Sequence, residues 1–196
     1  MKIEKQLKSV LEASRKLNLV TDETVQKVLF ELATEARSKA DLILAENQKD
    51  LDRMDIADPK YDRLKLTKER IEGIASDIEN VAKLKSPLGI VKSETTRPNG
   101  IKISKVTVPF GVIGIIYEAR PNVTFDVFAL CLKSGNACVL KGGSDAIHSN
   151  QTIVSIIQDV LGKYDLDENT VALLPAGREE TNEMLHAHGY IDLIIP

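Results

Sequence analysis

Two short apolar runs, separated by a segment long enough for a helix, constrain the fold more than any other feature of the sequence. Residues 112–116 are rich in β-branched side chains, and residues 138–140 form a second apolar run. Such runs are typical of strands buried on both faces, as in a parallel sheet. Parallel neighbours need a crossover of about a dozen residues or more, and residues 121–135 supply one. The sequence therefore predicts a β-α-β unit.

Strands and helices continue to alternate after this unit. Apolar runs at 170–174 and 191–195 predict two more strands, and helical periods over 144–162 and 178–188 predict the helices between them. This alternation is typical of an open parallel sheet with helices on both faces. We therefore expect an α/β fold, with a doubly wound Rossmann-like sheet over residues 110–196.

The N-terminal part of the chain has a helical pattern. Apolar residues recur at a 3.6-residue period over 3–17, over 21–52 behind a capping Thr21, and again after Thr67. These helices carry charges on their outer faces and no cluster of catalytic residue types. We expect residues 1–86 to form a helical layer of the nucleotide-binding domain. Nothing in the sequence favours a partner-binding arm instead.

A two-stranded β-ribbon is predicted over residues 87–109, between the helices and the sheet. The turn signal at residues 97–100, Arg-Pro-Asn-Gly, lies between two arms rich in apolar residues. Lys102 and Lys105 lie among the apolar positions, so we expect one face of the ribbon to be wet. Isolated two-stranded ribbons are marginal in water, so this ribbon should need a neighbour.

The second strand runs directly into a glycine-rich loop, Lys141-Gly142-Gly143-Ser144. Ligands of open α/β sheets bind at the C-terminal edge of the strands. Glycines let the backbone approach a phosphate closely, while Lys141 and Ser144 offer a cation and a hydroxyl. The loop is therefore a candidate nucleotide site, and a solvated loop lysine is the plainer alternative. The absence of a G-x-G-x-x-G fingerprint argues against the usual pyrophosphate turn.

Three segments of the chain carry a family resemblance: PNGIKISKVTVPFGVIGIIYEARPNVT, ALCLKSGNACVLKGGSDA and YIDLIIP. They resemble the γ-glutamyl phosphate reductases of the aldehyde dehydrogenase superfamily. Chains of that family are much longer, and their nucleophilic cysteine lies in a catalytic domain beyond the position that matches Pro196. The resemblance implies an aldehyde dehydrogenase-like fold that is incomplete here, because the catalytic domain is absent from this chain.

The resemblance also implies a cofactor, NADP(H), and the residues that bind it. In the superfamily the lysine at the position of Lys141 binds the adenosine ribose or the 2′-phosphate. Gly177 and the following helix match the segment beside the adenine and pyrophosphate, although an ordinary strand–helix turn is the alternative. The implied cofactor-binding residues are Lys141, Gly142, Gly143, Ser144, Gly177 and Arg178.

The loop after the first strand holds two candidates for catalysis, Arg120 and Asn122. The superfamily places an asparagine here whose amide stabilises the oxyanion of the acyl intermediate. Asn122 has the matching residue type, but a gapless alignment puts Arg120 in that column. Arg120 could instead hold a carboxylate or phosphate of the substrate. The plainer alternative is that Asn122 caps a helix and Arg120 pairs with Glu118.

Charge and composition exclude several classes of protein. A net charge of −3 and a pI near 5.7 give no reason to expect nucleic acid or an anionic membrane as a partner. The sequence has no transmembrane stretch and no apolar signal core, so we expect a cytoplasmic location. Cys131 and Cys138 are expected to be buried, unreactive thiols, and no cluster of residues resembles a metal site.

The function implied by the resemblance is the NADPH-dependent reduction of L-glutamyl 5-phosphate to L-glutamate 5-semialdehyde, in proline biosynthesis. This chain would be the cofactor-binding portion, and we expect it to be inactive alone. The implied partners are the small-molecule substrate, other copies of the chain in a homo-oligomer, and glutamate 5-kinase. The resemblance also implies that the ribbon at 87–109 projects and serves as the oligomerisation arm. Two alternatives stay open: a non-catalytic nucleotide-binding or assembly module, and another acylating aldehyde dehydrogenase.

Overall fold

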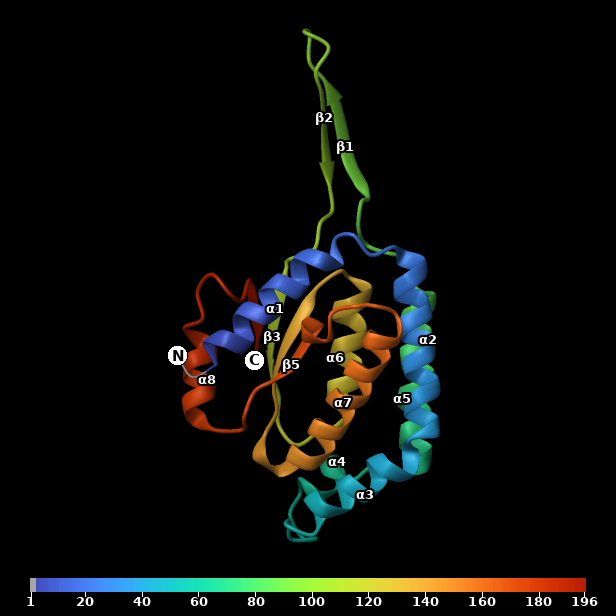
Figure 1. The fold of residues 1–196 in the computed structure, drawn as a ribbon, viewed down its shortest axis with the longest axis vertical. Coiled ribbons are helices and arrows are strands. Elements are labelled where there is room, and N and C mark those ends of the chain that lie inside the picture. The colour runs from blue at the N-terminus through green and yellow to red at the C-terminus, as the bar shows by residue number, and fades with distance from the viewer. Residues whose placement is uncertain (1–2) are drawn as a thin grey trace.

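The computed structural model describes residues 3–196, which contain a four-stranded sheet flanked by helices (Figure 1). The strands are β3 (Val112–Ile116), β4 (Ala137–Lys141), β5 (Val171–Leu173) and β6 (Leu193–Ile195). Their spatial order is β5-β4-β3-β6, and every neighbouring pair is parallel. The chain steps from β3 to β5 in one direction and then returns to place β6 on the other side of β3. The predicted doubly wound parallel sheet is therefore confirmed.

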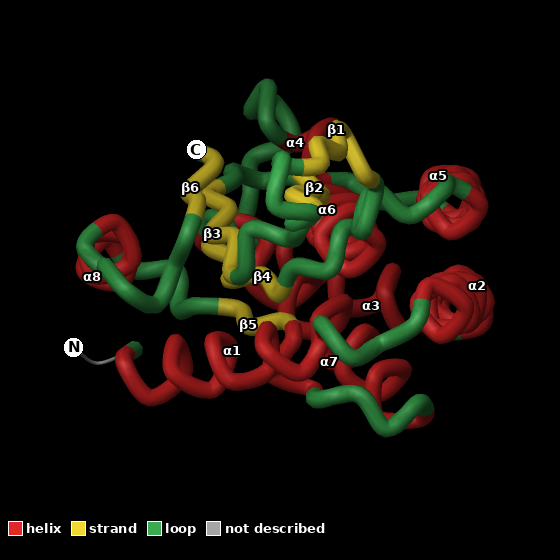
Figure 2. Tube along the Cα trace, turned by 90° about the horizontal axis from the view of Figure 1, so that it is seen from above, coloured by secondary structure: helices red, strands yellow, loops and turns green. Residues whose placement is uncertain are grey.

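Helices cover both faces of this sheet. Two of them, α6 (Asn122–Lys133) and α7 (Ile147–Lys163), connect the first three strands on one face. On the other face lie α8 (Arg178–Leu185) and α1 (Glu4–Leu17) (Figure 2). Because crossovers between parallel strands are right-handed, the return of the chain after β5 puts α8 on the face opposite α6 and α7.

Two long N-terminal helices form an outer layer behind α6 and α7 (Figures 1 and 2). They are α2 (Asp22–Ser38) and α5 (Lys68–Lys83), which pack side by side. The hydroxyl oxygens of Thr21 and Thr67 cap them, and accept the backbone N–H groups of Thr24 and Arg70 at 3.2 Å in each case. A side-chain cap satisfies one of the free N–H groups of a first helical turn and stabilises the helix by about 1 kcal/mol.

The single helix predicted over residues 21–52 is wrong, because the chain bends at Lys39. The backbone there has φ −95° and ψ 15°, outside the regular helical range. A separate helix, α3 (Ala40–Leu51), then runs in a new direction toward α7, and a short α4 (Tyr61–Leu64) follows it (Figure 1). The apolar period continues across Lys39, so periodicity alone could not reveal the bend.

A buried carboxylate links α3 to the start of α7. Asp50, on α3, is 1% exposed. It accepts the backbone N–H groups of His148 and Ser149 at 3.1 and 2.8 Å, and the hydroxyl of Ser149 at 2.7 Å. The residue at the N-cap position of α7, Ala146, offers no capping side chain. Asp50 therefore caps α7 from another helix, and a negative charge at a helix N-terminus is favourable.

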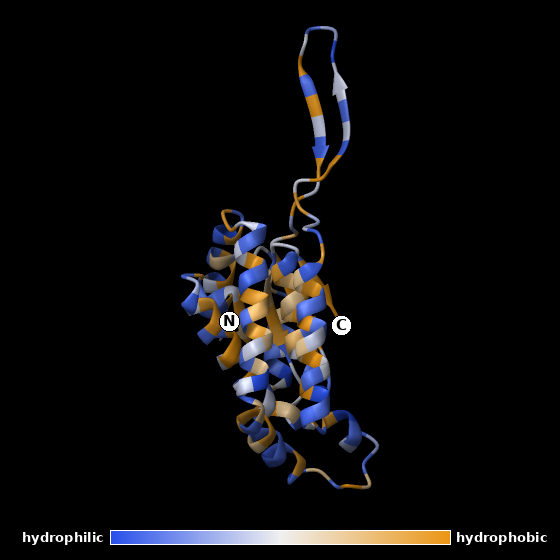
Figure 3. Ribbon diagram, turned by 90° about the vertical axis from the view of Figure 1, so that its right-hand side faces the viewer, coloured by the Kyte–Doolittle hydropathy of each residue, from blue (hydrophilic) through white to orange (hydrophobic). Residues whose placement is uncertain are grey.

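The predicted ribbon forms from β1 (Val91–Thr96) and β2 (Lys102–Val106), which pair antiparallel. It stands clear of the rest of the protein (Figure 3). We predicted one wet face, but every residue of both strands is exposed. The apolar side chains Val91, Ile103 and Val106 thus lack cover from residues 3–196.

The core lies between the sheet and its two helical layers, and includes the fully buried side chains of Phe125, Phe128, Leu132, Leu140 and Ile153. Of the helices in the described part of the chain, none is both long enough and apolar enough to cross a membrane.

Candidate functional site

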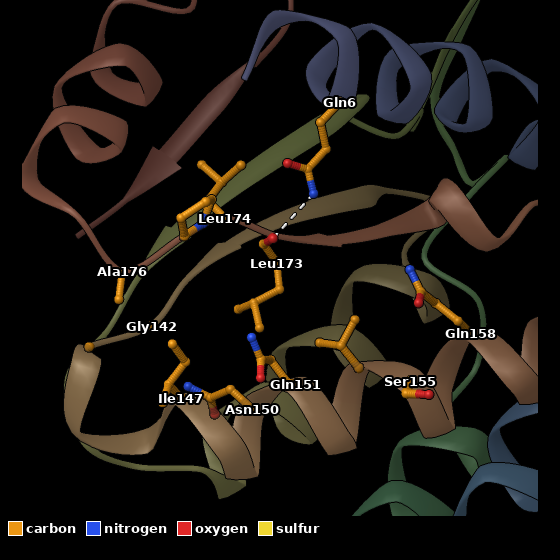
Figure 4. Close-up of a pocket in the computed structure, with 13 residues that line it drawn as sticks. Gln6, Gly142, Ile147, Asn150, Gln151, Ser155, Gln158, Leu173, Leu174 and Ala176 are labelled. Atoms are coloured by element: carbon orange, nitrogen blue, oxygen red, sulfur yellow. Dashed lines mark hydrogen bonds between the residues drawn. The ribbon is translucent and has the colours of Figure 1, made fainter. Parts of the chain in front are cut away.

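A cavity of about 410 Å³ lies where β4 and β5 end, at the C-terminal edge of the sheet (Figure 4). Its walls come from the loop after β4, the loop after β5, one side of α7 and the side chain of Gln6 on α1. Two of the predicted cofactor residues, Gly142 and Gly143, line it. Ligands of open α/β sheets bind at this edge, so the cavity is the candidate nucleotide site.

Lys141 ends β4 directly beside this cavity, and its surroundings differ from those of a loop lysine. The residue is 6% exposed, and its Nζ donates one hydrogen bond, to the carbonyl of Gly142 at 3.2 Å. Burial lowers the pKa of Lys141, and the carboxylate of Glu180 acts in the opposite direction. An ammonium group has three donors, so Lys141 keeps donor capacity for an anion. The alternative of a solvated lysine is wrong.

Gly142 is required by the packing beneath the loop. A Cβ at this position would lie 2.4 Å from Nδ2 of Asn150 and 3.4 Å from the ring of Tyr117. These neighbours belong to a buried chain of hydrogen bonds. The hydroxyls of Tyr117 and Thr124 are 2.7 Å apart, and Thr124 donates to Oδ1 of Asn150 at 2.9 Å. Burial raises the pKa of Tyr117 to about 12, so the phenol remains a neutral donor.

The other predicted cofactor residues lie around the cavity rather than in its wall. Ser144 is exposed and opens the 3₁₀ turn that precedes α7. Gly177 precedes α8, and Arg178 is its first residue; both are exposed. A Cβ on Gly177 would meet the carboxylate of Glu180 at 2.1 Å. The acidic side chain of Glu180 therefore lies at the start of α8, where we expected a cationic side chain to bind phosphate.

Several polar residues of the cavity were not predicted. Gln151, Ser155 and Gln158 line it from α7. Their spacing of i, i+4 and i+7 puts them on one side of that helix, and this pattern could have identified them. Gln6 could not have been found in this way, because its contact, a hydrogen bond from Nε2 to the carbonyl of Leu173 at 3.2 Å, spans 167 positions of sequence.

Arg120 and Asn122 lie in a different hollow, a groove of about 370 Å³ between the start of α6 and the segment from α4 to α5. The alternative that Asn122 caps α6 is wrong. Asn122 is the first helical residue, and its Nδ2 donates to Asp126 at 3.2 Å. The side chain of Arg120 forms no ion pair with Glu118 or with any other residue of 3–196. The loop after β4 is nearby, since a Cβ on Gly143 would lie 3.5 Å from the backbone of Glu118.

Both cysteines are free and buried, as expected. Contact with Cys131 and burial raise the pKa of the Cys138 thiol well above its ordinary value. A thiol with a raised pKa is a poor nucleophile at neutral pH. Among residues 3–196, no three His, Cys, Asp or Glu side chains gather as a metal site would require.

No family model matches the chain. The chain is 60% identical over 188 residues to a γ-glutamyl phosphate reductase of Bacteroides thetaiotaomicron, a match that covers 96% of this chain and 45% of that protein. The chain closely resembles one portion of the γ-glutamyl phosphate reductases. It spans a little under half the length of the curated relatives it matches.

Solved structures agree with this resemblance to the γ-glutamyl phosphate reductases. The reductase of Thermotoga maritima superposes with a TM-score of 0.97 at 36% identity, over 100% of this chain and 48% of its own. An acetylating aldehyde dehydrogenase of Geobacillus thermoglucosidasius superposes with a TM-score of 0.73 at 15% identity, over 98% and 40%. The second likeness concerns the fold alone, and confirms the predicted aldehyde dehydrogenase-like architecture.

Proposed function

We propose that this chain is the cofactor-binding portion of an enzyme that reduces L-glutamyl 5-phosphate to L-glutamate 5-semialdehyde with NADPH, a step of proline biosynthesis. The observation that carries the proposal is the 60% identity to a γ-glutamyl phosphate reductase over nearly the whole chain. A cavity at the C-terminal edge of a parallel sheet supports it independently.

The residues around the cavity fit a phosphorylated dinucleotide. Lys141 is buried and has spare donors, and a 2′-phosphate would supply the anion that it lacks. Gly142 and Gly143 leave their side of the cavity without side chains. Ser144 and Arg178 are exposed and follow the cavity-lining residues Gly143 and Ala176 closely in sequence, so in our proposal they bind further phosphate oxygens. When bound, the cofactor supplies the hydride; this portion of the protein binds and orients it.

The chain alone should bind the cofactor without turning over substrate. Its two thiols are buried, and reduction of an acyl phosphate through a thioester needs an accessible cysteine. We place that nucleophile in a further catalytic domain of the complete protein.

We also propose that the ribbon joins copies of the chain in a homo-oligomer, and that glutamate 5-kinase is a partner. We propose further that the protein works in the cytoplasm, where free thiols are the rule.

The test of the cofactor site is a fluorescence titration of the 196-residue chain with NADPH and with NADH. Lys141→Ala should weaken NADPH binding by about 10- to 100-fold, the cost of losing a charge-assisted hydrogen bond. NADH should lose less, because it has no 2′-phosphate. Lys102→Ala, on the ribbon, is the matched control and should bind both as the parent chain does. Unchanged NADPH affinity in Lys141→Ala would remove the cofactor assignment.

A further inference from the structure

The groove beside α6 gathers positive charge from two distant segments of the chain. Arg63, Lys65 and Arg70 line it from the α4–α5 segment, and Arg120 lines it from the loop after β3. Two carboxylates, Asp62 and Asp77, lie in the same wall. Cations therefore outnumber anions in the groove, although the whole chain has a net charge of −3.

One of these cations holds the loop in shape. Nη1 of Arg70 donates to the backbone carbonyls of Asp62 and Lys65, at 2.6 Å in each case. Its Nη2 pairs with the carboxylate of Asp62 at 2.9 Å. Arg70 thus uses its donors on the loop itself, and neutralises one of the two acids. It fixes the backbone on which Arg63 and Lys65 are carried.

The remaining three cations have no partner in the described chain. Within residues 3–196, the side chains of Arg63, Lys65 and Arg120 make no hydrogen bond and no ion pair. Elsewhere many cations are paired: Lys163, for example, contacts both Glu31 and Glu35. Three unpaired cations around one hollow attract an anion, and arginine suits carboxylate and phosphate oxygens because it can bind two at once.

A glycine in the wall of the groove points to a ligand independently. Gly73 lies inside α5, where glycine costs about 1 kcal/mol relative to alanine. A Cβ at this position would meet nothing within 4 Å, so the packing of this chain does not require glycine. Gly73 also faces the groove. A residue that weakens its helix without a structural reason fits a place where a bound molecule comes close.

We propose that this groove binds an anionic end of the acyl phosphate substrate, with Arg63, Lys65 and Arg120 as the recognition residues and Gly73 as the opening that admits it. The proposal rests on the proposed function, which supplies an acyl phosphate as substrate. Phosphate and carboxylate share the chemistry that these side chains recognise, and both occur on glutamyl phosphate. Asn122, in the same wall, would then face the substrate next to this anion.

The test uses ¹H–¹⁵N NMR titrations of the 196-residue chain with inorganic phosphate and, separately, with L-glutamate. We expect shifts at the backbone of the groove, and a loss of affinity of tenfold or more in Arg63→Gln/Arg120→Gln. Arg97→Gln, at the ribbon tip, should bind as the parent chain does. The ligand that shifts these residues identifies the end of the substrate that the groove holds. No groove shifts with either ligand, or equal affinity in the double variant, would overturn the proposal.

Gly73→Ala separates a binding role from a structural one. We expect the melting temperature to rise by about 2–4 °C, because alanine favours the helix, while affinity for the anion falls at least threefold. A rise in melting temperature with unchanged affinity would remove Gly73 from the site. NADPH titrations of all these variants should match the parent chain, so failure of the groove and failure of the cofactor site are told apart.

Discussion

The sheet and the ribbon are made from similar residues and yet have opposite surroundings. In β3, four of the five residues are buried; in β2, every residue is exposed. Both strands contain β-branched isoleucine and valine, which favour the extended conformation. The difference lies in what packs on them, since helices from both ends of the chain cover β3, whereas the described residues place nothing on the ribbon (Figures 1 and 3).

This contrast shows what residue type can and cannot specify. A β-branched run selects a strand, but the stability of that strand comes from side chains brought in from elsewhere. Burial of an apolar side chain contributes about 1.5–3 kcal/mol, whereas an exposed one contributes little. Substitutions in the helices that cover the sheet should therefore lower the free energy of unfolding strongly. Substitutions in the ribbon should change the association between chains rather than the stability of the fold.

The largest effect is expected at Phe128, a residue of α6 that lies in the core and is 1% exposed. Phe128→Ala should lower the free energy of unfolding by about 3–5 kcal/mol, through lost burial and the cavity left behind. Urea unfolding followed by circular dichroism measures it. Leu130→Ala, two residues further on in the same helix, is the control; Leu130 is 53% exposed, and its loss should cost less than about 1 kcal/mol. Equal losses would contradict the assigned packing of α6.

A smaller but still large effect is expected where α3 caps α7. Asp50→Ala leaves two backbone N–H groups and one hydroxyl without their acceptor, which should cost about 1–3 kcal/mol in the same unfolding assay. Asp50→Asn keeps one acceptor oxygen, so its stability should lie between that of the parent chain and that of Asp50→Ala. Asp52→Ala, on the exposed side after α3, should change stability by less than about 0.5 kcal/mol. If Asp50→Ala behaved like Asp52→Ala, α7 would not depend on this cap.

The sequence was informative where structure depends on neighbours along the chain. The period of apolar residues, the threonine caps and the Lys141 loop all act within a few residues, and they predicted most of the strands, the helices and the edge of the sheet that holds the cavity. It was uninformative where contacts span the chain. The bend at Lys39 brings α3 to α7, where Asp50 accepts the backbone N–H of Ser149, 99 positions away, and no local pattern announces that contact.

The two hollows show the same limit within the candidate site. Gly142 and Gly143 were found because the loop motif is local, and they line the cavity. The groove brings Arg63 and Lys65 next to Arg120 only because α5 packs against α6. In sequence Arg120 lies more than fifty positions from Arg63 and Lys65, and all three look like ordinary surface charges. Charge patterning along the chain could not have joined them.

The smallest effect on folding is expected in the ribbon, whose residues are exposed. Ile103→Lys should leave the free energy of unfolding within about 0.5 kcal/mol, because Ile103 is already 50% exposed. Its effect should appear in the mass measured by light scattering, since an exposed apolar side chain on an uncovered strand favours association with another chain. Ser104→Lys changes the opposite side of the same strand and is the matched control. If Ile103→Lys lowers the mass and Ser104→Lys does not, the face of the ribbon that carries Ile103 joins copies of the chain. If Ile103→Lys destabilises folding as Phe128→Ala does, the ribbon is part of the core after all, and the contrast between the two regions fails.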